Sequence, residues 1–343
     1  MIRRRAALAA ITGLATQAAV APAAAADAGA AALDFIALGD MPYGNDLLSG
    51  VAYRHLIDQI NALDLPFAIH VGDFKAGSAP CTDAEYAHQQ HQFQRFAQAL
   101  VYTPGDNDWL DCHRQGDHPL ERLRALRRRF FGAGAQSLGQ RPLALLRQGD
   151  AMPAHAAYVE NQRWVHGGVV FATFHTVGPD NGSQAGQADV RAEARDRETA
   201  NAAWIRAAFA LAQQMPARAL VLATQAEVQG DRLPAAPDQR PARRIAPGFE
   251  LSISQTLLPL ADAAPFPVLL IHGDAHHYTV DQPFRNVSGQ VISRLWRLQV
   301  FGEPQLHAVR VRVAPPGSQR PFAFTPVWNP TSTAPQWMRR TQR

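Results

Sequence analysis

The chain has 343 residues, of which 47% are hydrophobic and 18% are charged. This composition allows one large α/β domain with a substantial core, and it excludes a largely disordered chain. The formal net charge of +4 includes Arg3, Arg4 and Arg5, so residues 27–343 carry a charge of about +1. A nearly neutral chain gives no reason to expect binding to nucleic acid.

The N-terminal segment has the three parts of a secretory signal peptide. Its arginines are followed by an apolar stretch, and small residues precede Asp27. We therefore expect residues 1–26 to be a signal peptide and the mature protein to be periplasmic or secreted. An uncleaved anchor is the alternative, but the stretch is short and rich in alanine, and no later segment is apolar enough to span a bilayer.

Short apolar runs alternate with helical patterns in the first half of the chain. The predicted strands are residues 33–40, 66–73 and 100–106. The predicted helices are residues 47–62, 83–98 and 120–131. This rhythm predicts a parallel sheet with helices packed on it.

The second half repeats the rhythm before the pattern changes. Here the predicted strands are residues 169–175, 219–225 and 268–274, and the predicted helix is residues 193–214. Residues 290–302 and 306–313 alternate apolar and polar side chains, which predicts antiparallel strands with one solvated face. Residues 231–248 are interpreted as a surface loop, and the residues after 314 have no clear period. No domain boundary is evident, so residues 27–343 are expected to form a single domain.

The sequence contains two cysteines, Cys81 and Cys112. An even number of cysteines in an exported chain predicts one disulfide. Each cysteine follows an acidic loop by a few residues, so a bridge would tie those two loops together. Two separate buried thiols are the alternative.

Acidic residues and histidines follow several of the predicted strands. They are Asp40, Asp73, Asp106, Asp274, His276 and His277. Because the carboxyl ends of parallel strands lie at one edge of a sheet, we expect these side chains to converge. Carboxylates in one crevice repel each other unless cations neutralise them, so the pattern indicates a centre for one or two divalent metal ions.

The aspartates of this pattern have a second interpretation. The aspartates could instead cap the helices that follow them, although capping does not explain a recurring strand–Gly–Asp pattern.

Lys75 is the only lysine of the chain and lies two residues after Asp73, so we expect it to contact a substrate phosphate or to oppose the carboxylates. An ordinary surface lysine is the other interpretation. Trp109 is expected to anchor its loop on the core.

These motifs resemble those of the calcineurin-like metallophosphoesterases, a family that includes the purple acid phosphatases. The family order is Asp-x-His, Gly-Asp, Gly-Asn-His-Asp or Glu, a lone His, and Gly-His-x-His. The corresponding segments here are GDMPY, GDFK, GDND, TQAE and GDAH, with similar order and spacing over residues 33–280. The resemblance implies an α/β, calcineurin-like phosphoesterase fold, in which two packed mixed β-sheets are flanked by helices (αββα).

The resemblance also implies two sets of metal ligands. One set is Asp40, Asp73 and His276, with Tyr43 as an extra ligand. The other set is Asp73, Asp106, Gln225 and Asp274. The second set offers only oxygen, which favours Mn²⁺, Mg²⁺ or Ca²⁺ over Zn²⁺, and iron is a further candidate for the centre.

The sequence departs from the family where the leaving group would be protonated, because Asn107 replaces the usual histidine. Asn107 is then expected to face the substrate, and Asp108 to support the loop or orient its neighbours. His113, His175 and His277 are the candidates for the missing acid. The residues expected to bind substrate are Lys75, Tyr43 and His113.

The function implied by the resemblance is metal-dependent hydrolysis of a phosphate ester, with a metal-bound hydroxide as the nucleophile. The missing histidine motivates an alternative, a catalytically lapsed metal- or ligand-binding protein of the cell envelope on the same fold. A third interpretation is an extracellular scaffold without metal, in which the aspartates only cap helices.

Overall fold

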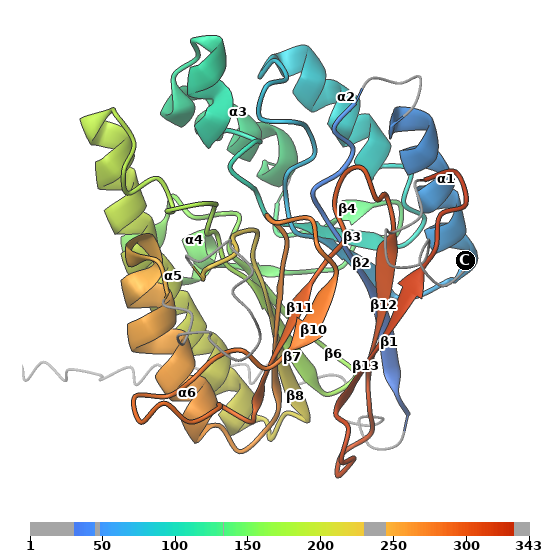
Figure 1. Ribbon diagram of the computed structural model, residues 1–343, viewed down its shortest axis with the longest axis vertical. Helices are drawn as coiled ribbons and strands as arrows, with labels where there is room; N and C mark the ends of the chain where they lie inside the picture. The colour runs from blue at the N-terminus through green and yellow to red at the C-terminus, as the bar shows by residue number, and fades with distance from the viewer. Residues whose placement is uncertain (1–30, 45–48, 133, 230–244, 333–343) are drawn as a thin grey trace, which may run out of the picture.

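The computed structural model describes residues 31–44, 49–132, 134–229 and 245–332. Two mixed β-sheets pack face to face, and helices cover the outer face of each sheet (Figure 1). This is the αββα arrangement that the resemblance implies. The predicted signal peptide lies outside the described residues, as does most of the predicted loop 231–248. None of the helices in the described ranges is long and apolar enough to cross a membrane.

The first sheet has six strands in the order β13-β12-β1-β2-β3-β4. Their bounds are β1 (Leu33–Leu38), β2 (Phe67–His70), β3 (Ala99–Tyr102), β4 (Leu138–Gly139), β12 (Ala308–Val313) and β13 (Phe322–Val327). Strands β1, β2 and β3 are parallel, so their carboxyl ends share one edge. The helices over this sheet are α1 (Ser49–Ala62), α2 (Asp83–Phe93) and α3 (Pro119–Phe131) (Figure 1).

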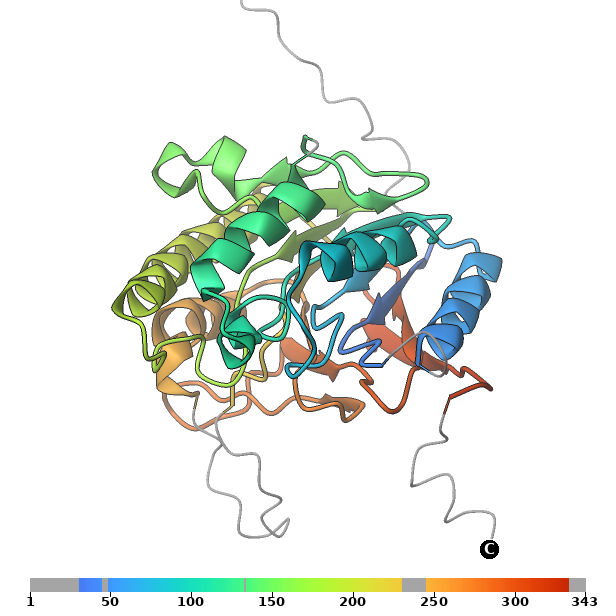
Figure 2. The same cartoon turned by 90° about the horizontal axis from the view of Figure 1, so that it is seen from above.

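The second sheet has seven strands in the order β10-β11-β9-β8-β7-β6-β5. Their bounds are β5 (Leu146–Arg147), β6 (Gln162–His166), β7 (Val169–Thr173), β8 (Ala219–Ala223), β9 (Val268–His272), β10 (Thr279–Asp281) and β11 (Leu295–Gln299). Strands β7, β8, β9 and β11 are parallel. The helices over this sheet are α5 (Ala188–Gln214) and α6 (Leu258–Ala263) (Figures 1 and 2).

Shorter helical segments lie between these elements. They are η1 (Leu110–Gln115), α4 (Gln148–Ala151), η2 (Pro153–His155), η3 (Pro247–Phe249) and η4 (Glu250–Leu257).

Aromatic side chains fill the space between the two sheets. Phe35 of β1 and Phe67 of β2 stack with their ring centroids 5.3 Å apart. Both rings meet the edge of Phe171 of β7, at 5.3 and 5.0 Å, and Trp164 of β6 stacks on Phe171. All four side chains are buried. Because these contacts cross from one sheet to the other, they fix how the two carboxyl edges face each other.

The structure corrects several sequence-based boundaries. Residues 290–302 were expected to form an antiparallel strand with one solvated face. Strand β11 does pair antiparallel with β10, but it also pairs in parallel with β9 and is mostly buried. Arg297 is a polar residue of the alternating pattern, but it is only 4% exposed because it pairs with Asp281 at 2.6 Å. Helix α2 ends at Phe93 rather than 98. Residues 306–313 do contain an antiparallel strand, as predicted, and β13 was not predicted at all.

Candidate metal centre

The predicted site residues meet where the carboxyl edges of the two sheets adjoin. Asp40 and Asp73 follow strands of the first sheet, whereas Gln225 and Asp274 follow strands of the second. The backbone N–H of Asp274 donates to both carboxylate oxygens of Asp40, at 3.0 and 3.1 Å. The amide nitrogen of Gln225 donates to Oδ2 of Asp73 at 3.1 Å. The convergence expected from the parallel strand ends is therefore present.

The aspartates of the recurring strand–Gly–Asp pattern do not cap helices. Asp40 lies well before α1, and the N-cap of α2 is Thr82 rather than Asp73. The N-cap of η1 is Trp109 rather than Asp106. The capping interpretation is therefore wrong.

Four of the predicted ligand residues have left-handed backbone conformations. The φ angles are 52° at Asp40, 55° at Asp73, 76° at Asp274 and 60° at His276. Residues other than glycine adopt the left-handed backbone conformation at a free-energy cost, and residues in this conformation cluster at functional sites. The conformation turns the chain sharply after each strand and directs the side chain across the edge of the sheet.

Tyr43, Asp73 and His276 form a compact group of donor atoms. The Tyr43 hydroxyl lies 3.1 Å from Oδ2 of Asp73 and 3.1 Å from Nε2 of His276. Nδ1 of His276 lies 2.8 Å from the Glu303 carbonyl, which fixes the proton on Nδ1 and leaves the Nε2 lone pair facing the group. Both 3.1 Å distances are hydrogen-bond lengths, so the three side chains form one hydrogen-bonded group. Phenol, carboxylate and imidazole are also groups that can bind a divalent cation.

The surroundings of three buried carboxylates at this edge disfavour their charged forms. Burial raises the pKa of Asp73, and the charges of Asp106 and Asp108 raise it further. Burial, followed by the charge of Asp274, likewise raises the pKa values of Asp40 and Asp106. Oδ1 of Asp106 is buried and has no hydrogen-bond partner within the described part of the chain.

Two glycines let the backbone approach these carboxylates closely. A Cβ atom at Gly105 would lie 2.0 Å from Oδ1 of Asp73, and one at Gly273 would lie 2.1 Å from Oδ2 of Asp40. Such distances are far inside van der Waals contact. Gly105 and Gly273 are thus required because a neighbouring strand end places its own carboxylate against each of them.

The donor set suits a hard cation beside Asp73, but not through acidic and histidine side chains alone. Across the ranges that the structure describes, no three His, Cys, Asp or Glu side chains form a group arranged to hold a metal. The group around Asp73 includes a phenol, and Asp106 adds a carboxylate oxygen without a partner. Gln225 presents no oxygen to the centre, because its Oε1 accepts the N–H of Gly178 at 2.9 Å.

Asn107 and Asp108 have different environments within one loop. The backbone N–H of Asn107 donates to Oδ1 of Asp73 at 3.0 Å, and its side-chain amide donates to Tyr43 at 2.9 Å. Asp108 is fully buried. Its carboxylate accepts the N–H groups of Asp73, Phe74 and Gly105 and the Tyr102 hydroxyl, at 2.8 to 3.0 Å. The geometry thus places Asn107 at the centre and makes Asp108 the link between two acidic loops.

The predicted disulfide is confirmed. Cys81 and Cys112 are bonded, with their Cα atoms 5.7 Å apart. The bridge joins the segment after Asp73 to the segment after Asp106, which are the loops that Asp108 also connects.

Lys75 opposes the carboxylates, which is one of its two predicted roles. Burial lowers the pKa of Lys75, and the charges of Asp108 and Asp73 act against that shift. The side chain is only 2% exposed, and its ammonium donates to the carbonyls of Ala76 and Ala79 at 3.3 and 3.2 Å, so the interpretation as a surface lysine is wrong.

Two of the predicted substrate or acid residues lie away from the donor group. His113 is exposed, with Nδ1 2.9 Å from the carbonyl of Leu110. His277 is also exposed. None of these contacts joins Asp73.

A buried chain of contacts behind the loop was missed by the sequence analysis. The indole N–H of Trp109 donates to Nε2 of His175 at 3.1 Å, and Nδ1 of His175 lies 2.8 Å from Glu160. Arg127 pairs with the other side of Glu160. Trp109 is fully buried, as expected of an anchor, but Glu160 belongs to no motif and gave no signal. His175 is enclosed here and positions Trp109.

Comparison with solved structures identifies the fold. PhoD aligns with a TM-score of 0.51 over 89% of this chain and 72% of that chain, at 11% identity. GAP50, the inner membrane complex anchor of Plasmodium, gives 0.48 over 88% and 86%, at 11% identity. A dimetal phosphatase from Danio rerio gives 0.47 over 87% and 99%, at 10% identity. No protein-family model matches the chain, and neither does any curated protein. The likeness to PhoD shows a shared phosphoesterase fold and nothing further.

Proposed function

We propose that this chain is an exported, metal-dependent phosphoesterase that hydrolyses a phosphate ester at the edge described above. The observation that carries the proposal is the Tyr43–Asp73–His276 group, in which the Tyr43 hydroxyl lies 3.1 Å from each partner, beside the unpartnered carboxylate oxygen of Asp106. The phosphoesterase fold supports it.

Several residues of the chain would have distinct roles around a bound cation. Asp73, His276 and Tyr43 would hold it, with Asp106 as an additional oxygen ligand. A divalent cation such as Mn²⁺, Mg²⁺, Ca²⁺ or Fe²⁺ would supply positive charge that offsets the carboxylates and polarises a phosphoryl group or a water. The Asn107 side chain has two amide hydrogens, of which one is given to Tyr43, so the other is available to a phosphoryl oxygen.

The same geometry limits the kind of ester. His276 is hydrogen-bonded to Tyr43, and its Nδ1 is held by the Glu303 carbonyl. Asn107 stands where the family has its acid, and His113 and His277 are exposed, so we infer that no imidazole protonates the leaving group. We therefore expect aryl phosphates, whose phenolates leave without a strong acid, to react better than alkyl phosphates.

Hydrolysis of an aryl phosphate and the matching diester by residues 27–343 tests the proposal. The protein is assayed stripped of metal and then with Mn²⁺, beside the Asp73→Asn variant and an Asp58→Asn control at an exposed position of α1. Turnover should require metal, persist in the control, and fall more than about 100-fold in Asp73→Asn, because loss of even an outer contact of a metal site costs 10- to 100-fold. Full activity in Asp73→Asn would contradict the assignment.

The second candidate function is a metal-binding envelope protein without catalysis. It is favoured specifically by Asn107, which stands where the family has its acid, and by the exposed positions of His113 and His277. A folded protein whose thermal midpoint rises with Mn²⁺, but which hydrolyses neither ester, would establish this alternative.

A further inference from the structure

Glu303 belongs to one more strand–Gly–acid segment at the carboxyl edge of the second sheet. Strand β11 ends at Gln299, and Gly302 and Glu303 follow it closely. Because β11 is parallel to β9, Glu303 lies at the same edge as Asp274. Glu303 is only partly exposed, and its contacts are with residues of the candidate metal centre and with the loop after β1.

The main chain of Glu303 contacts two of the predicted metal ligands. Its N–H donates to the carbonyl of Asp40 at 2.9 Å, and its own carbonyl lies 2.8 Å from Nδ1 of His276. Gly302 makes this approach possible, since a Cβ atom there would lie 2.7 Å from Cβ of Asp40 and 2.7 Å from Cγ of His276. The main chain of residues 302–303 therefore packs directly against both ligands.

The side chain of Glu303 contacts a third predicted ligand, Tyr43. Its Oε2 accepts the backbone N–H of Tyr43 at 3.3 Å, and its Oε1 accepts the Ser49 hydroxyl at 2.7 Å. Ser49 is the first residue of α1. The carboxylate thus connects the Tyr43 loop to the start of a helix, while the main chain of the same residue holds Asp40 and His276.

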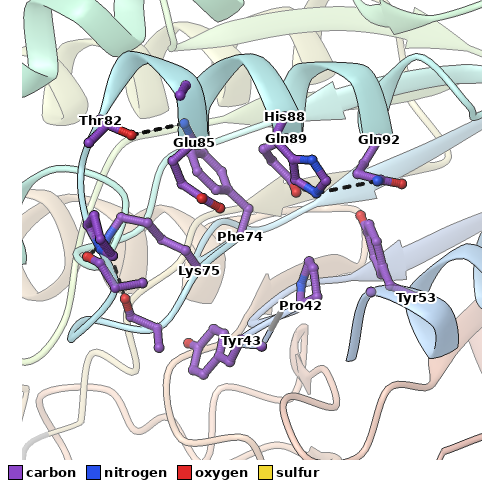
Figure 3. Close-up of a pocket in the computed structure, with 16 residues that line it drawn as sticks. Pro42, Tyr43, Tyr53, Phe74, Lys75, Thr82, Glu85, His88, Gln89 and Gln92 are labelled. Carbon is purple, nitrogen blue, oxygen red and sulfur yellow. Dashed lines mark hydrogen bonds between the residues drawn. The ribbon is translucent and has the colours of Figure 1, made fainter. Parts of the chain in front are cut away.

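Packing alone does not fix the position of Tyr43. Its ring meets the edge of the His276 ring, with the centroids 5.1 Å apart. It also lines a cavity of about 600 Å³ that lies between α1 and α2 (Figure 3). A ring that borders a cavity has fewer neighbouring atoms than a ring in a packed core. Hydrogen bonds to Tyr43 therefore contribute more to placing its hydroxyl beside Asp73 and His276.

We propose that Glu303 is a positioning residue of the candidate metal centre, and that its carboxylate holds Tyr43 so that the phenol stays beside Asp73 and His276. The carboxylate acts by accepting hydrogen bonds rather than through its charge. Removal of a group that orients a metal ligand commonly lowers metal affinity by 10- to 100-fold. This inference rests on the metal centre of the proposed function, and it adds a residue that binds no cation itself.

Two substitutions of Glu303 separate geometry from charge. Glu303→Ala removes both hydrogen bonds of the side chain. Glu303→Gln removes the charge and keeps both bonds, because its oxygen can accept the Tyr43 N–H while the Ser49 hydroxyl, which can donate or accept, takes a hydrogen from the amide. The Kd for Mn²⁺ is measured from the EPR signal of free Mn²⁺, which needs no turnover. Glu250→Ala, at an exposed position at the start of η4, is the control.

Glu303→Ala should raise the Kd for Mn²⁺ by about tenfold or more, whereas Glu303→Gln and the control should stay within about threefold of the wild type. A Glu303→Ala variant that binds Mn²⁺ like the wild type overturns the inference. Equal losses of affinity in the alanine and glutamine variants also overturn it, because the charge of Glu303 would then be responsible.

A double-mutant cycle with Tyr43→Phe tests whether Glu303 acts through Tyr43. Phenylalanine keeps the backbone N–H that Glu303 holds, but it lacks the hydroxyl at the centre. If Glu303 positions that hydroxyl, Glu303→Ala should change the Kd for Mn²⁺ by less than about threefold in the Tyr43→Phe background. A general loosening of the fold would lower the affinity by the same factor in both backgrounds, and that result would overturn the inference.

The hydrolysis assay separates this inference from the proposed function. A protein whose Mn²⁺ affinity depends on Glu303 as described, but which hydrolyses no ester, supports the inference, and only the proposed catalysis fails. Metal-dependent turnover together with an unchanged Kd in Glu303→Ala overturns the inference alone. A wild type that binds no Mn²⁺ overturns both.

Discussion

Replacing Asp108 with asparagine tests how the acidic centre is held together. The Asp108 carboxylate accepts hydrogen bonds from three backbone N–H groups, those of Asp73, Phe74 and Gly105, and from the Tyr102 hydroxyl. Asparagine has the same shape, but one of its terminal atoms is an NH₂ group that donates. At least one of the four donors must then face another donor.

The size of the effect follows from how the four bonds are distributed. Oδ2 accepts three of them, and Oδ1 accepts only the N–H of Phe74, at 2.9 Å. The best orientation of the asparagine therefore keeps its oxygen at the Oδ2 position and leaves the Phe74 N–H unpaired. A bond to a charged group contributes about 1.5–3 kcal/mol, and an unsatisfied buried donor costs about 1–3 kcal/mol. Burial raises the pKa of Asp108, so removing its charge relieves an unfavourable interaction and offsets part of the lost stability. We therefore expect a net loss of about 2–3 kcal/mol.

Urea unfolding of the metal-free protein measures this loss directly. Asp58→Asn on the exposed face of α1 is the matched control, and its free energy of unfolding should stay within about 0.5 kcal/mol of the wild type. The Asp108→Asn variant should also show a smaller rise in Tm with Mn²⁺, because the Asp73 loop is less well positioned. A change below about 0.5 kcal/mol in Asp108→Asn would refute the view that this carboxylate holds the two loops.

Two further predictions concern the surroundings of the centre. The Cys81→Ser/Cys112→Ser variant should lose about 3–4 kcal/mol of stability, since the bridge closes a loop over a sequence separation of 31 residues; an unchanged urea midpoint would contradict this. His70 should destabilise the fold in acid, because Nε2 already contacts the Met41 carbonyl, Nδ1 accepts the Gly72 N–H, and burial lowers the His70 pKa to about 3. The unfolded chain binds this proton first, so stability is lost as pH falls below about 6.5, by about 1.4 kcal/mol per pH unit, and His70→Gln should reduce that slope. Equal slopes for both proteins between about pH 6 and 4.5 would exclude this account.

The sequence was sufficient for features that depend on local pattern or on chain order. Asp40 and Asp73 follow buried apolar runs and a glycine, and parallel strands bring such positions to one edge whatever the distant contacts are. The pairing of Cys81 with Cys112 needed only an even count and an exported chain. These predictions used rules that do not require knowledge of which segments become neighbours.

The features that were missed depend on contacts between distant segments. Arg297 made β11 look half solvated, because nothing in the sequence shows that Asp281 pairs with it inside the fold. Gln225 was expected to offer an oxygen to a metal, but the N–H of Gly178 takes that oxygen, 47 residues away in sequence. Glu160 supports Trp109 only through His175, so no motif marks it. Side-chain direction and pairing are decided by tertiary packing, which a local pattern does not contain.

Several independent restraints act on the acidic edge and hold its loops together. Its carboxylates repel one another, and four of its residues have left-handed backbone conformations, so the edge on its own would relax by moving its loops apart. The Cys81–Cys112 bridge, the four bonds to Asp108 and the Trp109–His175 contact each oppose that movement from a different side. The restraints keep the acidic side chains gathered where, on the proposed function, a cation and a phosphate ester would meet.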